Sequence, residues 1–336
     1  MVSQGCFTRR LTYCAFAFFM AMGLTTFALP AEAEVLSLKF ENDLLTTGED
    51  GHYTNGVELV WTFEPERTHW SQGFTRALPN ALIEQADSVS YHFAHQMYTP
   101  NDIDQEALIE NDRPYAGLMY GGVNFHDIDR YDSARRATHL NLDIGLVGPA
   151  TEAEELQKSV HKLTGSDDPQ GWDNQLRNEP IINLGLRRQW MNERSLAGLD
   201  FEHGPNLVGA LGNLYTYAGA GYGLRWGSSL DDSYGIPAIA PSQGGRLYFT
   251  SRPGFDWFFF ANLEGRFMAY NLLLDGNSFK TSHSVDRKEW VGDIQLGVAV
   301  TWDGWQLTYS GVARTKEFSE QNSADEFGSL VLSHAF

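Results

Sequence analysis

The sequence predicts an all-β protein: a transmembrane antiparallel β-barrel of about twelve strands, with a short helix in one extracellular loop. Three observations carry this prediction: an N-terminal segment typical of export, strand-length segments in which apolar and polar residues alternate, and a last strand that ends in Phe336. The 33 glycines among 336 residues agree with it, because glycine is common in turns and unfavourable inside helices.

The composition excludes two classes of protein. The chain has 24 Lys and Arg residues against 43 Asp and Glu residues, which gives a net charge of −19. Nucleic acid is excluded as a partner, because contacts with phosphates need an excess of basic side chains. Disorder is excluded because hydrophobic residues make up 42% of the chain and can bury a large core.

The first residues have the pattern of a secretory signal peptide. Arg9 and Arg10 precede an apolar stretch, and Ala31 and Ala33 on either side of Glu32 form an A-x-A cleavage site. We expect residues 1–33 to be removed on export, which leaves residues 34–336 as one barrel domain. A retained membrane anchor is the less favoured alternative, because the cleavage site is well placed.

The mature chain is expected to lack disulfides and membrane-spanning helices. Cys6 and Cys14, the two cysteines of the sequence, both lie in the signal peptide. A spanning helix needs about 18 or more apolar residues in a row. The one long uncharged run, residues 206–224, is interrupted by five glycines and suits two strands around a turn.

The clearest strand alternation lies between Trp290 and Trp302. One face carries these two tryptophans and Ile294, whereas the other carries Asp293 and Gln295. A soluble sandwich shows the same alternation, but its strands are usually about half this long. Twelve steps of about 3.3 Å, tilted by about 45°, rise about 28 Å, which is close to the apolar thickness of a bilayer.

Twelve segments have strand character, and an even number places both termini on the periplasmic side. They lie near residues 35–44, 52–63, 88–97, 114–126, 137–147, 181–191, 199–211, 213–227, 254–270, 286–302, 305–316 and 327–336. The proposed periplasmic turns at 64–87 and 228–253 are longer than usual and are the weakest part of this count. The terminal Phe336 is similar to the assembly signal of bacterial outer-membrane barrels.

One segment between the fifth and sixth strands breaks the two-residue period and predicts a helix of about three and a half turns. Thr151 with Glu154 forms a capping box at its start, and Gly165 is a suitable C-terminal stop. The helix therefore belongs to an extracellular loop of the barrel.

A candidate functional face follows from this helix. Gln157 and His161 are four residues apart and share one face, with Ala153 and Leu156 near the same side. The alternative is a solvated loop helix whose His161 only faces water.

The densest polar motifs fall on the same rim as the helix. Strands alternate in direction, so the ends of the first and third and the starts of the second and fourth all meet at the outer rim. The motifs lie at residues 41–43, 50–56, 97–100 and 111–117. A random scatter would place half of them on the other rim, so the clustering favours a functional role for His161.

These residues resemble the lipid A 3′-O-deacylase (LpxR) family of outer-membrane enzymes. The matching stretches are Phe40-Glu41-Asn42-Asp43, Tyr53-Thr54-Asn55-Gly56, His95-Gln96-Met97-Tyr98-Thr99-Pro100, Asp112-Arg113-Pro114-Tyr115-Ala116-Gly117, Gly145-Leu146-Val147-Gly148-Pro149, Gln157 with His161, and the stretch 171–179. They cover residues 40 to about 190, and the C-terminal half matches mainly by strand pattern. The resemblance implies a twelve-stranded barrel with calcium-dependent ester hydrolysis near the outer rim, between barrel wall and loop helix.

The resemblance also implies site residues. Asn42, Asp43 and Thr54 fall on the active-site strand ends of the family, and Gln157 and His161 fall on its helix. We expect all five to be catalytic or to hold the metal.

Two further positions follow less directly from the resemblance. A family glutamate falls near Asp167 or Asp168, and we take Asp167 as the candidate metal ligand. The second outer loop departs from the family, whose characterised enzyme has a lysine-rich loop there. Residues 101–112 are acidic and contain no Lys, so Arg113 is the nearest cation and the candidate substrate-binding residue.

The chemistry that these residues allow is attack by an activated water. A neutral imidazole accepts a proton near neutral pH, which makes His161 the candidate general base. No Gly-x-Ser-x-Gly sequence occurs, and both cysteines belong to the signal peptide. A nucleophile elbow or a thiol mechanism is therefore not supported.

A calcium ion would assist this attack. Ca²⁺ prefers oxygen ligands, which Asp43, Thr54 and Asp167 could supply. Asn42 could donate its amide N–H to the oxyanion, and Gln157 could orient water or substrate.

The leading hypothesis is therefore a calcium-dependent outer-membrane ester hydrolase that removes a 3′-linked acyl chain from lipid A. Its partners would be lipopolysaccharide and outer-membrane lipids. One alternative is a passive pore or structural barrel, for which charged residues should line opposed inner walls. Another is an esterase or phospholipase that acts on a different outer-leaflet lipid.

Overall fold

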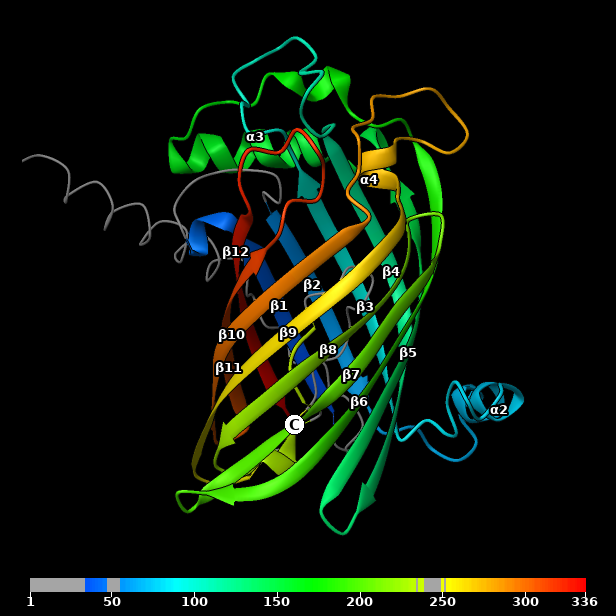
Figure 1. The fold of residues 1–336 in the computed structure, drawn as a ribbon, viewed down its shortest axis with the longest axis vertical. Coiled ribbons are helices and arrows are strands. Elements are labelled where there is room, and N and C mark those ends of the chain that lie inside the picture. The colour runs from blue at the N-terminus through cyan, green and yellow to red at the C-terminus, as the bar shows by residue number, and fades with distance from the viewer. Residues whose placement is uncertain (1–33, 47–54, 234, 239–248, 251) are drawn as a thin grey trace, which may run out of the picture.

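The structure is a computed structural model that describes residues 34–46, 55–233, 235–238, 249–250 and 252–336. The predicted signal peptide and Thr54 lie outside the described residues. Within them the chain forms one closed antiparallel β-barrel, in which β1 pairs with β12 (Figure 1). The barrel predicted from the sequence is confirmed.

Twelve strands form the wall, each within a few residues of its predicted position. They are β1 (Val35–Asn42), β2 (Asn55–Phe63), β3 (Ser88–Tyr98), β4 (Ala116–Tyr131), β5 (Ala134–Val147), β6 (Glu179–Leu196), β7 (Leu199–Gly212), β8 (Tyr215–Gly227), β9 (Phe255–Asn271), β10 (Trp290–Trp302), β11 (Trp305–Arg314) and β12 (Asp325–Ala335). The helices are α2 (Trp70–Ala77), α3 (Ala153–Thr164) and α4 (Leu272–Asp275), with the 3₁₀-helices η1 (Asp43–Leu45), η2 (Pro149–Thr151), η3 (Gly171–Asn174) and η4 (Leu230–Asp232). Among the described residues, no helix is both long enough and apolar enough to cross a membrane.

The alternation in β10 separates the outer face of the wall from the lumen. Trp290 is 70% exposed and Leu296 is 62% exposed, although both are large apolar side chains. Asp293 and Gln295, which alternate with them, are buried inside the barrel. Apolar side chains therefore point outward and polar ones inward, which is the arrangement expected of a barrel that lies in lipid.

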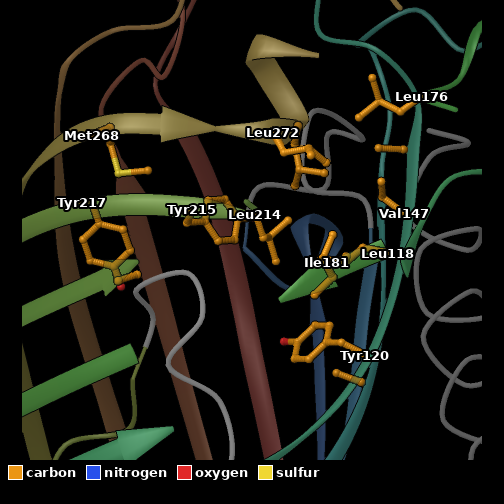
Figure 2. Packing of buried hydrophobic residues seen from close by; sticks show 14 of the residues in the cluster. Leu118, Tyr120, Val147, Leu176, Ile181, Leu214, Tyr215, Tyr217, Met268 and Leu272 are labelled. Atoms are coloured by element: carbon orange, nitrogen blue, oxygen red, sulfur yellow. The ribbon is translucent and has the colours of Figure 1, made fainter. Parts of the chain in front are cut away.

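The lumen is filled by side chains at its outer end. Ala94 and Tyr120 of the wall pack there with Leu214, Tyr215 and Leu272 in the largest apolar cluster (Figure 2). Leu272 comes from α4, which follows β9, so the loops contribute to this plug. The outer end of the lumen is therefore a packed apolar core.

Below this plug, ion pairs join strands of the wall. Glu264 of β9 accepts from Arg187 of β6 at 2.6 Å and from Arg266 at 3.0 Å. Asp293 of β10 continues the chain by accepting from Arg266 at 2.6 Å and from Arg314 of β11 at 2.8 Å. Each of these five groups has a partner of opposite charge, as buried ions require.

Removing the central carboxylate should destabilise the barrel. Glu264→Gln leaves Arg187 buried without its acidic partner, whereas Arg266 keeps Asp293, and this change should lower the free energy of unfolding by about 3–5 kcal/mol. The measurement is urea unfolding from lipid vesicles, followed by tryptophan fluorescence. Glu326→Gln, at an exposed position on β12, is the control and should change little. Equal unfolding midpoints for the two variants would contradict the role of this network.

Candidate functional site

The loop after β5 folds into η2, α3 and η3, and α3 starts one residue later than the capping box predicts. Glu152 is the N-cap, with a left-handed backbone (φ 56°) and no side-chain cap. The hydroxyl of Thr151 instead donates to the carbonyl of Gly148 at 2.7 Å and closes η2. The predicted capping box is therefore wrong, because the tight 3₁₀ turn uses the threonine. The predicted stop is confirmed: Gly165 has φ 72° and donates to the carbonyl of His161.

The start of α3 packs on the outside of the barrel wall. On β3 and β4 the even-numbered side chains, such as Ala94 and Tyr120, point into the interior cluster, so the odd-numbered ones point outward. Gly117 is outward-facing, and a Cβ at this position would lie 2.0 Å from Thr151 Oγ1 and 2.5 Å from the Cβ of Ala153. A glycine is therefore needed for the helix to approach the wall this closely.

Two contacts hold the loop in this place. The ring of His95, outward-facing on β3, donates through Nε2 to the carbonyl of Thr151 at 3.0 Å. Met97, also outward-facing, forms a small buried cluster with Tyr115, Ala153 and Trp172. The helix is thus fixed to the outer surface of β3 and β4 at the rim.

The buried face of α3 carries the predicted pair. Ala153, Gln157 and His161 are the buried residues of the helix. Leu156, which was expected near this side, is 43% exposed, so its placement is corrected. The reason is the helical period, since residue 156 lies on the turn beside the 153–157–161 row.

Gln157 has one amide atom engaged and one without a partner. Its Oε1 accepts from the indole N–H of Trp172 at 2.7 Å, and the side chain is only 1% exposed. Its Nε2 is buried and has no hydrogen-bond partner. A buried donor without a partner is costly, so this N–H is available to a bound oxygen. No local pattern singles out Trp172 as a site residue, although it lies in a stretch that resembles the family.

His161 has a defined tautomer. Its Nδ1 lies 2.5 Å from the backbone carbonyl oxygen of Asp167. A carbonyl oxygen only accepts, so Nδ1 carries the proton and Nε2 carries the lone pair. The side chain is 8% exposed, so it lies at the edge of the buried face and can still be reached.

The two acidic candidates after the helix are both exposed. Asp167 contacts His161 through its backbone carbonyl, and this contact orients the imidazole. Asp168 accepts from the side chain of Gln170 through its own carbonyl. On α3, Lys158 pairs with Glu154 at 2.5 Å, and this hydrogen bond raises the pKa of Lys158.

The strand-end candidates lie on the same rim. Asn42 ends β1 on the outward-facing register, because Glu41 beside it is buried against Lys39 in the lumen. Asp43 is buried at the start of η1, and its carbonyl accepts from the N–H of Thr46 at 3.1 Å. Thr54 lies outside the described residues.

The length of α3 allows it to span the distance to these strand ends. Only β2 and β3 separate β1 from β4, a distance of about 14 Å at about 4.8 Å per strand. The 12 residues of α3 span about 18 Å, and the helix lies across the top of the barrel (Figure 1). A helix fixed at Gly117 is therefore long enough to reach the level of Asn42.

Arg113 lies apart from this group. Its guanidinium stacks over Tyr98 at 4.6 Å and lies 3.8 Å from Glu317. Tyr98 points into the barrel, so Arg113 is buried on the luminal side of the wall. The structure does not bring it together with His161, and this environment suits a structural role.

Among the described residues, one group of three acidic side chains lies close enough together to share a metal ion. It consists of Glu193, Glu202 and Asp231, at the end of the barrel opposite α3. Glu202 already pairs with Arg135 at 2.9 Å and with Arg225. Among the candidate metal ligands at the outer rim that the structure describes, Asp43 is the one with a buried carboxylate.

The chain matches the model of one protein family, and its structure is similar to those of several outer-membrane barrels. The family whose model matches residues 11–336 is described as outer membrane protein LpxR. The structure of LpxR from Salmonella typhimurium has a TM-score of 0.75 at 19% identity, covering 90% of this chain and 100% of that chain. The β-domain of the Bordetella autotransporter Brka has a TM-score of 0.45 at 10% identity, covering 91% of this chain and 100% of that chain. No curated protein sequence matches.

The role of Gly117 can be tested by adding one methyl group. Gly117→Ala should displace the start of α3, because its Cβ would overlap Thr151 and Ala153. Hydrogen exchange should then be faster throughout α3, while the strands keep their protection. Gly121→Ala is the matched control on the same face of β4, since its nearest contact is an ordinary 3.4 Å. Unchanged protection of α3 in Gly117→Ala would contradict the packing described above.

Proposed function

Since this chain belongs to the LpxR family of outer-membrane proteins, we propose that it is an ester hydrolase that removes a 3′-linked acyl chain from lipid A. The observation that carries the proposal is the position of the buried face of α3. Gln157 and His161 lie in one row with Ala153, which packs on the outer surface of the wall, so a membrane lipid would reach them without entering the barrel.

The outer wall below α3 suits an acyl chain. Leu59 on β2 and Phe93 on β3 are exposed apolar side chains that point outward. An acyl chain that lies along these strands would place its ester linkage higher, near the rim, where the polar groups begin. Substrate and site therefore share one depth in the membrane.

His161 would act as the general base. Nε2 holds the lone pair, because Nδ1 donates to the carbonyl of Asp167. Nε2 takes a proton from water while the water oxygen bonds to the acyl carbonyl carbon. The ester C–O bond then breaks, and the departing sugar oxygen takes the proton back from the imidazolium. The products are a free fatty acid and a hydroxyl group.

Two amide groups would stabilise or position the reacting oxygens. Nε2 of Gln157 is a buried donor without a partner, and we assign it to hold the attacking water or the substrate. Asn42 would donate its amide N–H to the oxyanion. Asn42 and α3 lie on the same rim, and the length of α3 permits this convergence.

We propose Ca²⁺ as the cofactor, as the resemblance to the family implies. When bound, the ion would stabilise negative charge on the carbonyl oxygen. Asp43 would hold it, together with Thr54 and Asp167. The described residues do not complete a calcium site by themselves.

The pore alternative is disfavoured by how the luminal charges are arranged. Charged residues do line the inner wall, as a pore requires, but they pair directly with one another, as in Arg187–Glu264 and Arg314–Asp293. The apolar cluster around Tyr215 and Leu272 fills the outer end of the lumen. These features favour a wall that supports an external site.

His161→Ala should abolish deacylation while the barrel still folds. Loss of a general base typically costs about 10²–10⁴-fold in rate. The measurement is mass spectrometry of lipid A from cells that produce each variant, with gel mobility of unheated protein as the test of folding. Lys162→Ala, the exposed neighbour on the same helix, should retain activity.

Full activity of a folded His161→Ala variant would exclude the base role. Loss of acyl chains from phospholipids, with lipid A unchanged, would favour the alternative phospholipase. An ionic current through the protein in planar bilayers, without any deacylation, would instead favour the pore.

Removal of calcium should also abolish deacylation. Chelation should abolish activity, and Ca²⁺ should restore it better than Mg²⁺, which demands a stricter octahedral geometry. Asp43→Asn should raise the Ca²⁺ concentration needed for half-maximal activity. Activity that is insensitive to chelation would remove the ion from the proposal and leave the role of His161 standing.

A further inference from the structure

The segment between β2 and β3 contains a helix that the sequence did not predict. Residues 64–87 were expected to form a long periplasmic turn, but Trp70–Ala77 form α2. This helix lies outside the barrel, on the opposite end from α3 (Figure 1). It begins after His69, whose ring accepts from the N–H of Ser71 at 3.3 Å.

The two faces of α2 are reversed relative to a helix on a soluble protein. Trp70, Gly73, Phe74 and Ala77 follow the i, i+3, i+4, i+7 pattern of one face and are all exposed. The buried residues are the hydroxyl residues Ser71 and Thr75. Trp70 is 49% exposed and Phe74 is 41% exposed, which is a large apolar area for so short a helix.

These two aromatic side chains join others on the outer wall. Trp70 contacts Phe125 at 5.6 Å between ring centroids and donates its indole N–H to the hydroxyl of Tyr91 at 3.0 Å. Phe74 stacks on Phe125 at 5.1 Å. Phe63 of β2 stacks on Tyr91 at 5.8 Å. Aromatic belts of this kind mark the border between membrane and water.

The wall becomes charged immediately beyond this belt. Asp127 and Asp129 follow Phe125 on the same outward register of β4, and Asp129 pairs with Arg136 of β5. Arg188 of β6, also outward-facing, donates to the carbonyl of Leu82 at 3.1 Å. The segment that carries α2 is thus anchored to the wall where the apolar surface ends.

We infer that α2 is an interfacial helix that inserts its exposed apolar face into the periplasmic leaflet of the membrane. The occupant is phospholipid, because the apolar face is continuous with the lipid-facing wall through Phe125. Such helices lie about 5–10 Å deep, at the boundary of headgroups and acyl chains. The one charged residue of α2, Arg76, can reach the headgroup phosphates from this position. This inference is independent of the proposed hydrolase activity.

Spin labels can test this position, because the mature chain is expected to have no other cysteine. Gly73→Cys lies on the exposed face, and a Cβ there meets nothing within 4 Å. Leu296→Cys, on the outer wall of β10, serves as the lipid reference, and Glu66→Cys, exposed before α2, serves as the water reference. The protein is refolded in vesicles of phosphatidylethanolamine and phosphatidylglycerol, and gel mobility verifies that each labelled barrel is folded.

The label at residue 73 should be several-fold more accessible to oxygen relative to a water-soluble nickel complex than the label at residue 66. Its ratio should approach that at residue 296. A ratio at residue 73 equal to that at residue 66 would place α2 in water and overturn the inference. A label at residue 73 that neither reagent reaches would indicate a protein partner or a second copy, and would overturn it as well.

Discussion

The structure depends on one constraint: a β-sheet in lipid has no water to satisfy its edges, so it must close. β1 pairs with β12 along its length, and this closure gives every strand two neighbours. Closure also fixes which side chains face the lumen and which face lipid. The buried ion pairs, the plug at the outer end of the lumen and the helix on the outer wall all follow from that division.

The candidate site differs from an enclosed enzyme cavity because it uses the outer surface of this closed wall. Gly117 allows α3 to contact the wall. The loop that follows α3 covers Gln157 and His161, through the indole of Trp172 and the carbonyl of Asp167. Water is kept from the amide of Gln157 by Trp172 and the packed loop. A polar group can therefore remain buried beside a lipid surface, where a membrane-bound substrate need not leave the bilayer.

The strands could be predicted because alternation is local, whereas contacts between strands were beyond prediction. The pairing of Glu264 with Arg187 joins β9 to β6, and no local pattern indicates which luminal carboxylate meets which arginine. The predicted start of α3 was wrong because Thr151 closes a 3₁₀ turn and does not cap the helix. The position of this turn is set by its packing against Gly117. Helix α2 was missed because its eight residues are too few for a clear period and its apolar face points outward.

Helices α2 and α3 both lie against the outer surface of β3 and β4, and this has a consequence for the bilayer. Gly117 beneath α3 and Phe125 beside α2 are eight residues apart on β4, which is about 26 Å along the strand. At a tilt of about 45° the rise is about 19 Å, less than the band of about 25 Å that is usual for such barrels. Lipids on this side would be compressed to match, and local thinning would draw the headgroups of both leaflets toward the protein.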